Sequence, residues 1–256
     1  MKVVILAGGL PSTLTGYNDN IPKPMLEIGE RPILWHIMKH FSMYGYNEFV
    51  ICGGYKVSMI KEYFNNYYVY QSDIMVDLSN NCITILKNIT EDWKVTVVDT
   101  GLEARTGLRI GRIQKYINED EFIVTYGDCL SDIAVDKMIE YHYEKKKKVT
   151  VAVTKPTGRN IALNIDKSNN YRGINDNEGE EDGSWVNTGT YILNREVFLY
   201  LQEDKHLEED MLQRMADENM VAAYKHKGFW TPVETQRDKQ ALEEMWCRNE
   251  APWKTE

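Results

Sequence analysis

The stretches MKVVILAGGL (residues 1–10) and FVICGG (residues 49–54) decide the fold of this chain. Each is a short, unbroken apolar run that ends in a glycine pair. Such runs are typical of strands buried on both faces of a parallel sheet. The first run has one lysine and no small-residue cleavage site, so we interpret it as a strand rather than a signal peptide. Similar runs predict strands at Thr96–Val98, Phe122–Thr125, Val149–Val153 and Val186–Leu193.

Helical patterns alternate with these runs. Pro32–Tyr44 has apolar residues at helical spacing and a proline suited to the first turn. Further helices are predicted at Val57–Phe64, Ile133–Tyr143, Arg195–Gln202, Glu208–Glu218 and Arg237–Trp246. The alternation predicts an α/β fold, with a Rossmann-like, mostly parallel mixed sheet flanked by helices. We expect one domain over residues 1–256, with a polar insertion at about 155–185 that includes a hairpin turning at Asn169-Asn170.

Composition excludes several partners. The 256 residues include 30 Lys+Arg and 39 Asp+Glu, for a formal net charge of −9. The chain therefore offers no global positive field for nucleic acid or an anionic membrane. No apolar run is long enough to span a bilayer. Four scattered cysteines, with no CxxC and no metal-ligand spacing, indicate a reduced, cytoplasmic protein without disulfides.

Three local features have both a structural and a functional interpretation. The lysine run 145–148 favours a solvated helix end over an anion site. His36 and His40 lie one helical turn apart, as zinc ligands can, but no third ligand is in register. A tyrosine cluster favours packing or a subunit interface over base stacking; it comprises Tyr63, Tyr67, Tyr68 and Tyr70.

Candidate chemistry follows the strands, because ligands of such sheets bind outside the carboxyl ends of the strands. Gly8-Gly9 lets backbone N–H groups approach phosphate oxygens, with a plain tight turn as the alternative. GxGxxG and GK[ST] are both absent, which argues against a dinucleotide oxidoreductase and a Walker A loop. Two prolines bracket Lys23 and aim its charge. Asp128 ends the YGD run and is suited to Mg²⁺, with Glu234 as a second carboxylate.

Taken together, these segments resemble the sugar-1-phosphate nucleotidyltransferases, and most closely the glucose-1-phosphate cytidylyltransferases of bacterial polysaccharide synthesis. The similar segments extend along the whole chain and include MKVVILAGGL, IPKPMLEIGERPILWHIMKH, VTVVDTGLEARTG, FIVTYGD, GFWTPVETQRDK and APWKT. The resemblance implies a nucleotidyltransferase fold, CTP and a sugar phosphate or similar phosphorylated small molecule as substrates, and Mg²⁺ as cofactor. We also expect a homo-oligomer.

The resemblance also implies roles for individual residues. Lys23 and Asp128 are the catalytic candidates, and Asp128 and Glu234 are the metal candidates. The expected nucleotide-binding residues are Leu6, Ala7, Gly8, Gly9, Thr106, Gly107, Tyr126 and Gly127. The expected substrate-binding residues are Arg159, Asn187, Thr188 and Gly189.

The sequence departs from the family pattern at the sites that bind both substrates. The family loop GGxGTRL is GGLPSTL here, with Pro11 at a glycine position and Thr13 at the position of the catalytic arginine. Leu108 replaces the second glycine of the family's TGGR motif, and Cys129 replaces the glycine that follows YGD. Glu234 replaces the family's second metal-binding aspartate. The family's EKP motif is absent, because the region is INDNEGEEDG. We therefore keep two hypotheses: a cytidylyltransferase that makes a CDP-linked product and pyrophosphate, and a non-catalytic homologue that binds nucleotide or acts as a partner subunit.

Overall fold

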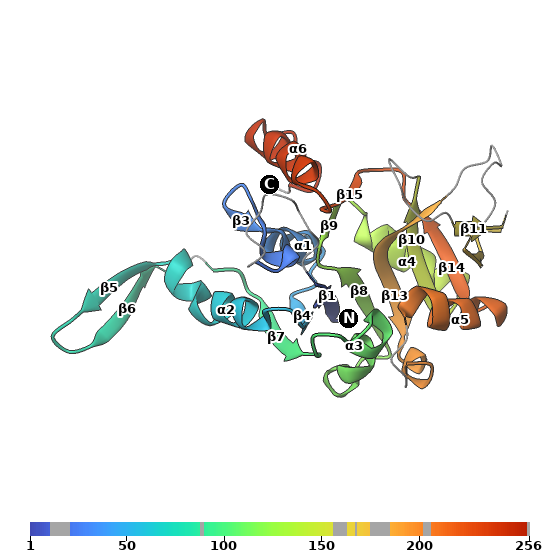
Figure 1. Cartoon of the computed structure of the whole chain (residues 1–256), viewed down its shortest axis with the longest axis horizontal. Coiled ribbons are helices and arrows are strands. Elements are labelled where there is room, and N and C mark those ends of the chain that lie inside the picture. The colour runs from blue at the N-terminus through green and yellow to red at the C-terminus, as the bar shows by residue number, and fades with distance from the viewer. Residues whose placement is uncertain are drawn as a thin grey trace.

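The chain folds around a central mixed sheet, as the computed structural model shows for residues 1–10, 21–87, 90–155, 163–166, 168–174, 185–201 and 206–254. Within these residues the sheet has seven strands in the order β14-β10-β13-β8-β1-β4-β7. Their bounds are β1 Val3–Ala7, β4 Glu48–Gly53, β7 Lys94–Asp99, β8 Glu121–Tyr126, β10 Val149–Thr154, β13 Val186–Asn194 and β14 Val221–Lys225. The prediction of a mostly parallel sheet flanked by helices is confirmed (Figure 1).

One strand runs against the others. β1 pairs in parallel with β4 and β8, and β10 pairs in parallel with β14. β13 lies antiparallel between β8 and β10. The start of β13 therefore lies at the same edge of the sheet as the carboxyl ends of β8 and β10. This reversal brings Asn187 beside the loop that follows β8.

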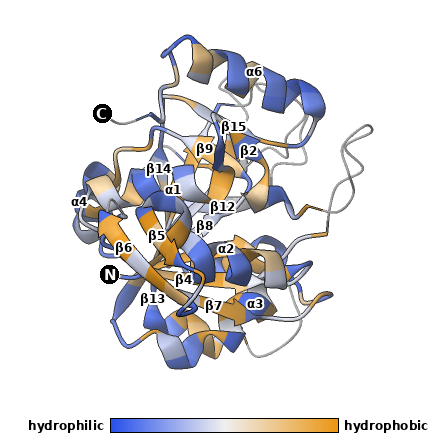
Figure 2. Ribbon diagram, turned by 90° about the vertical axis from the view of Figure 1, so that its left-hand side faces the viewer, coloured by the Kyte–Doolittle hydropathy of each residue, from blue (hydrophilic) through white to orange (hydrophobic). Residues whose placement is uncertain are grey.

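Helices cover both faces of the sheet and bury two apolar clusters. One face packs against α1 (Ile33–Met43), α2 (Val57–Gln71), α4 (Val135–Lys145) and α6 (Gln236–Cys247). The other face packs against α3 (Thr106–Arg112), the 3₁₀ helix η3 (Arg195–Leu199), the π-helix η4 (Leu207–Leu212) and α5 (Gln213–Asp217). Figure 2 shows hydrophobic residues on the sheet strands and a mainly hydrophilic α6. No helix in the described parts of the chain is long and apolar enough to cross a membrane.

Short elements position the loops around the sheet edge. β9 (Cys129–Ser131) pairs with β15 (Trp230–Pro232), and β2 (Glu27–Ile28) pairs with β3 (Arg31–Pro32). The 3₁₀ helices η1 (Lys23–Met25) and η2 (Gln114–Tyr116) precede β2 and β8 respectively. A small hairpin of β11 (Leu163–Ile165) and β12 (Tyr171–Ile174) lies inside the polar segment 155–185. Asn169 adopts the left-handed conformation at its turn.

The sequence did not predict a second hairpin, formed by β5 (Asp73–Asp77) and β6 (Cys82–Lys87). It projects from the end of α2 as an arm (Figure 1). Its signals were present, because Asn80-Asn81 marks the turn and Ile83 begins a β-branched run. Asn81 has a φ of 51°, as such turns require. The alternation is hard to recognise because apolar residues on both faces of the arm are exposed.

Candidate active site

The site is centred on Asp128, which lies in the loop after β8. Asp128 Oδ2 lies 3.3 Å from the Lys23 Nζ atom, so the two catalytic candidates form an ion pair. Lys23 opens η1 between two prolines, and the Pro22 carbonyl accepts a bond from the backbone of Met25. This rigid turn holds the ammonium group beside the carboxylate. An ammonium group held in this way is suited to steady the negative charge of a phosphate group.

Asp128 and Glu234 line one pocket, which we call the acceptor pocket. β9 and β15 cause this proximity, because Cys129 pairs with Pro232 and the Val233 amide donates to the Asp128 carbonyl over 2.8 Å. The pocket has a volume of about 220 Å³. It is also lined by Tyr126, Cys129, Asn187, Thr188, Gly189, Trp230 and Pro232.

A second pocket, which we call the nucleotide pocket, joins the first at Tyr126 and Asp128. It has a volume of about 360 Å³ and lies across the carboxyl ends of β1, β7 and β8. Its lining residues are Leu6, Gly8, Gly9, Leu10, Leu102, Glu103, Ala104, Arg105, Thr106, Arg109, Tyr126, Asp128 and His206. Two substrates that occupy these pockets would therefore meet at Asp128.

Most of the expected binding residues lie at these pockets. Leu6, Gly8, Gly9, Thr106 and Tyr126 line the nucleotide pocket, and Asn187, Thr188 and Gly189 line the acceptor pocket.

Three expected nucleotide-binding residues line neither pocket, and packing explains their places. Ala7 is buried in the cluster beneath α1, and Gly107 is buried inside α3. Gly127 is confined, because a Cβ there would lie 3.0 Å from both the Leu6 carbonyl and Pro24. Arg159, Pro11 and Thr13 lie outside the described residues.

Arg109 holds the nucleotide pocket together, a role that the sequence analysis missed. Its side chain is buried, and its guanidinium donates to the carbonyls of Gly8 (2.8 Å), Gly53 (3.3 Å), Gly101 (2.7 Å) and Leu102 (3.0 Å) and to the Thr100 hydroxyl (2.9 Å). These groups lie at or just after the carboxyl ends of β1, β4 and β7. A Cβ on Gly8 would lie 2.1 Å from the guanidinium, so Gly8 makes room for the arginine as well as bordering the pocket.

A carboxylate from the π-helix supports the wall shared by the pockets. Glu208 accepts hydrogen bonds from the hydroxyls of Tyr126 and Tyr191, the latter over 2.7 Å, and from the Asn187 amide over 3.4 Å. Asn187 Oδ1 in turn accepts from the Gly189 amide over 2.8 Å. Burial, followed by the charge of Glu208, raises the pKa of Tyr126 well above its ordinary value. Tyr126 is therefore a neutral donor, and its ring is held in place between the two pockets.

Thr106 links this π-helix to the nucleotide pocket. Its hydroxyl accepts a hydrogen bond from the Leu207 amide over 2.9 Å at the start of the π-helix. π-Helical turns often occur at functional sites. Only the tertiary structure brings Glu208 here, because more than eighty residues separate it from Tyr126 in the sequence.

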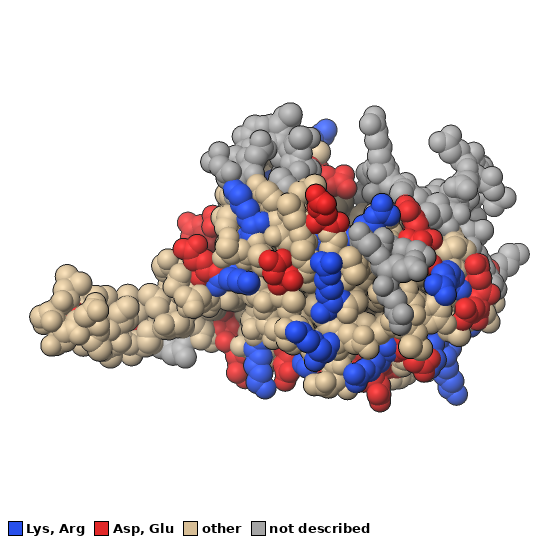
Figure 3. Space-filling view, turned by 60° about the horizontal axis from the view of Figure 1, so that its bottom comes forward, with Lys and Arg blue, Asp and Glu red and all other residues tan. Residues whose placement is uncertain are grey.

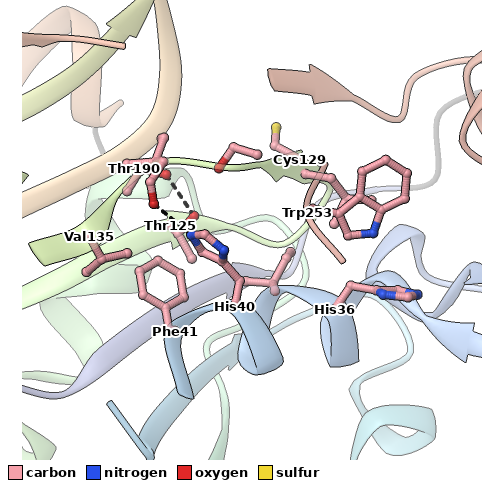
Figure 4. A pocket seen from close by; sticks show the side chains of 12 residues that line it. His36, His40, Phe41, Thr125, Cys129, Val135, Thr190 and Trp253 are labelled. Carbon is pink, nitrogen blue, oxygen red and sulfur yellow. Dashed lines mark hydrogen bonds between the residues drawn. The ribbon is translucent and has the colours of Figure 1, made fainter. Parts of the chain in front are cut away.

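A small cavity lies behind the Asp128 loop and is no substrate pocket. Its volume is about 20 Å³, room for about one water molecule. Figure 4 shows His40 reaching from α1 toward the hydroxyls of Thr125 and Thr190, which lie 3.1 Å apart. His40 Nε2 bonds the Ile133 carbonyl over 2.9 Å, and His36 Nε2 bonds the Ile28 carbonyl over 2.8 Å. Each histidine thus has a backbone partner inside the core.

The side chains that could bind a metal ion at this site are cysteines and carboxylates. All four cysteines are free thiols. Burial, followed by the neighbouring Asp128 charge, raises the pKa of Cys129, whose sulfur lies 3.6 Å from Asp128 Oδ1. The described residues hold no group of three or more His, Cys, Asp or Glu side chains arranged for a metal ion. Two carboxylates with room for substrate oxygens fit Mg²⁺, which commonly keeps waters and binds substrate phosphates.

Comparison with known proteins identifies the family of this chain. A model of the nucleotidyl transferase family matches residues 2–238. The chain belongs to the nucleotidyl transferase family. It is 41% identical, over its full length and 99% of the relative, to a glucose-1-phosphate cytidylyltransferase of Salmonella typhimurium. A probable glucose-1-phosphate cytidylyltransferase of Bacillus subtilis is 35% identical over 99% of both chains.

A solved structure confirms the fold at lower identity. The Yersinia pseudotuberculosis protein HddC superposes with a TM-score of 0.75 at 24% identity, over 96% of this chain and 99% of that one. The chain therefore shares its fold with that solved structure.

Proposed function

We propose that the protein is a CTP-dependent sugar-1-phosphate cytidylyltransferase that makes a CDP-linked product and pyrophosphate. The full-length match to the Salmonella glucose-1-phosphate cytidylyltransferase carries this proposal. The two pockets that meet at Asp128 support it, because an acceptor phosphate and a triphosphate must approach at one point. No comparison favours the non-catalytic alternative.

The proposed reaction is an in-line displacement. An oxygen of the acceptor phosphate attacks the α-phosphorus of CTP, and pyrophosphate leaves with the electron pair of the broken P–O bond. Lys23 would steady the charge on the transferring phosphate, and its ion pair with Asp128 holds it in place before substrates arrive. Asp128 and Glu234 would hold Mg²⁺, which supplies charge neutralisation for the phosphates.

A homo-oligomer is the second part of the proposal, and the β5–β6 arm supports it. An isolated two-stranded ribbon is marginally stable in water, and its outer edges are unpaired. The arm exposes 52% of Met75, 88% of Leu78 and 62% of Leu86. Figure 3 shows it projecting from the body with few charged side chains. We propose that a second copy of the chain covers it, and Leu86→Lys should lower the mass measured by light scattering. An unchanged mass would contradict an assembly through the arm.

The experiment for the activity is a pyrophosphate-release assay. CTP, Mg²⁺ and a panel of sugar and polyol phosphates are offered to the native protein, with ATP, GTP and UTP as nucleotide controls. We expect turnover with CTP and its loss in Asp128→Asn. If the folded native protein is inactive with every acceptor while Pro11→Gly with Thr13→Arg is active, the non-catalytic alternative is correct. The cytoplasmic location expected from the cysteines stays a prediction.

A further inference from the structure

A third cavity lies at the same edge of the sheet, beyond the acceptor pocket. Its volume is about 630 Å³. It is bounded by the carboxyl ends of β10 and β14, the residue before β13 and the loop before β15. We call it the lysine–tryptophan pocket, after its lining residues Lys155, Trp185, Lys227 and Trp230; Thr154, His226, Gly228, Phe229 and Thr231 complete it.

The lysine–tryptophan pocket continues the row of substrate pockets. The nucleotide and acceptor pockets share Tyr126 and Asp128, and the acceptor pocket shares Trp230 with this third one. Trp230 is buried, and its indole nitrogen donates to the Thr188 carbonyl over 2.8 Å. The tryptophan is therefore a fixed wall between two neighbouring cavities. A ligand whose phosphate lies at Asp128 would have to extend over this side chain to enter the third cavity.

The chemistry of the lining favours an anion. The Lys155 and Lys225 ammonium groups lie 6.0 Å and 5.0 Å from the centre of the Trp185 ring. Lys227 adds a third, exposed cation. No carboxylate is among the described residues that line the pocket; Asp132 lies just behind the lining, with its Oδ1 atom 3.0 Å from Nε2 of His226. The chain has a net charge of −9, but the lysines make this pocket locally positive next to the aromatic Trp185 ring.

The sizes of the two cavities point to a ligand that uses both. Small-molecule sites commonly occupy about 300–1,000 Å³. The acceptor pocket, at about 220 Å³, is below that range, whereas the lysine–tryptophan pocket is within it. A single phosphorylated group at Asp128 would leave the larger cavity unused.

We propose that the lysine–tryptophan pocket is a second acceptor subsite, which binds an anionic group at the end of the acceptor remote from the reacting phosphate. The acceptor class is then a sugar or polyol phosphate that carries a second phosphate or a carboxylate. Lys155 and Lys227 bind this group, and Trp185 packs against the adjoining carbon skeleton. This inference rests on the proposed cytidylyltransferase function.

The sequence just before Trp185 is acidic, so carboxylates of the chain itself are the alternative occupants of the pocket. Asp176, Glu178, Glu180, Glu181 and Asp182 precede Trp185 in the sequence. If these carboxylates rather than a substrate satisfied the lysines, Glu180→Gln with Glu181→Gln would bind a bis-anionic acceptor that the native protein does not bind. That result would overturn the proposal.

The test compares acceptors that differ in the remote group. Glucose 1-phosphate, glucose 1,6-bisphosphate and glucuronic acid 1-phosphate are assayed with CTP and Mg²⁺. We expect kcat/KM to favour the two bis-anionic acceptors, and Lys155→Gln with Lys227→Gln to reduce that preference at least about tenfold, since a charge-assisted bond is commonly worth that much. Lys94→Gln is the matched control, because Lys94 begins β7 at the opposite edge of the sheet. Equal preference in native and variant proteins would overturn the proposal.

A binding measurement separates this inference from the proposed function. Calorimetry with glucose 1,6-bisphosphate, without CTP, should detect binding to the native protein and at least about tenfold weaker binding to the double lysine variant. Turnover with glucose 1-phosphate alone, and no binding of the bisphosphate, would overturn the subsite and leave the cytidylyltransferase function standing. Bisphosphate binding that requires the lysines, with no turnover of any acceptor, would support the pocket and contradict the function.

Discussion

Replacing Arg109 with lysine should loosen the nucleotide pocket and destabilise the protein. The guanidinium donates to five acceptors at or just after the carboxyl ends of β1, β4 and β7. Lysine keeps the charge but has three donors, so at least two of the five acceptors lose a hydrogen bond. Hydrogen bonds to charged groups contribute roughly 1.5–3 kcal/mol each, and neighbouring losses are not additive. We expect the free energy of unfolding to fall by about 2–5 kcal/mol, a large part of the roughly 5–15 kcal/mol typical of a domain.

The same change should raise the KM for CTP, because the carbonyls of Gly8 and Leu102 hold two walls of the nucleotide pocket. Urea unfolding and steady-state kinetics measure the two effects. Arg112→Lys is the control, since Arg112 lies one helical turn away, is exposed and donates to the Thr100 carbonyl. The account of Arg109 is wrong if Arg109→Lys lowers the free energy of unfolding by less than about 1 kcal/mol, which is below the usual value of even one such bond, and if its KM for CTP equals that of Arg112→Lys.

Three further predictions concern catalysis, the shared wall and pH. Lys23→Ala should lower turnover at least about tenfold while circular dichroism stays native, a modest loss for a group that stabilises transition-state charge; unchanged turnover would remove Lys23 from the mechanism. Glu208→Gln should raise the KM for the acceptor more than the KM for CTP, because the amide binds the wall less firmly; equal KM changes would argue against that role. Burial lowers the pKa of His36, His40 and His142, so these groups are neutral in the fold and bind protons on unfolding. Stability should therefore fall as pH drops below the unfolded value of about 6.5, by at most about 1.4 kcal/mol per pH unit for each histidine. Urea unfolding at pH 7.5, 6.5 and 5.5 measures this, and a flat profile would contradict it.

Particular residues show how far local patterns reach in this protein. The apolar runs at Val3–Ala7 and Phe122–Thr125 predicted strands that the structure contains, because burial on both faces of a sheet leaves a local pattern. The same pattern placed Asp128 at the carboxyl edge. The helix predicted from Glu208 to Glu218 begins instead as a π-helix at Leu207, followed by the short α5. A π-helix and an α-helix bury similarly spaced apolar residues, so the sequence pattern does not distinguish them.

The sequence by itself determined the fold class and the family, because strand burial, glycine-ended turns and the motifs around Lys23 and Asp128 are local features of the chain. Only the tertiary structure decided which distant residues meet. The antiparallel course of β13 brings Asn187 to Asp128, and Glu208 reaches Tyr126 from another part of the chain. Strand direction and the partner of a buried charge depend on contacts between segments far apart in sequence. No periodicity within one segment records those contacts, and they set the shape of the pockets at the sheet edge.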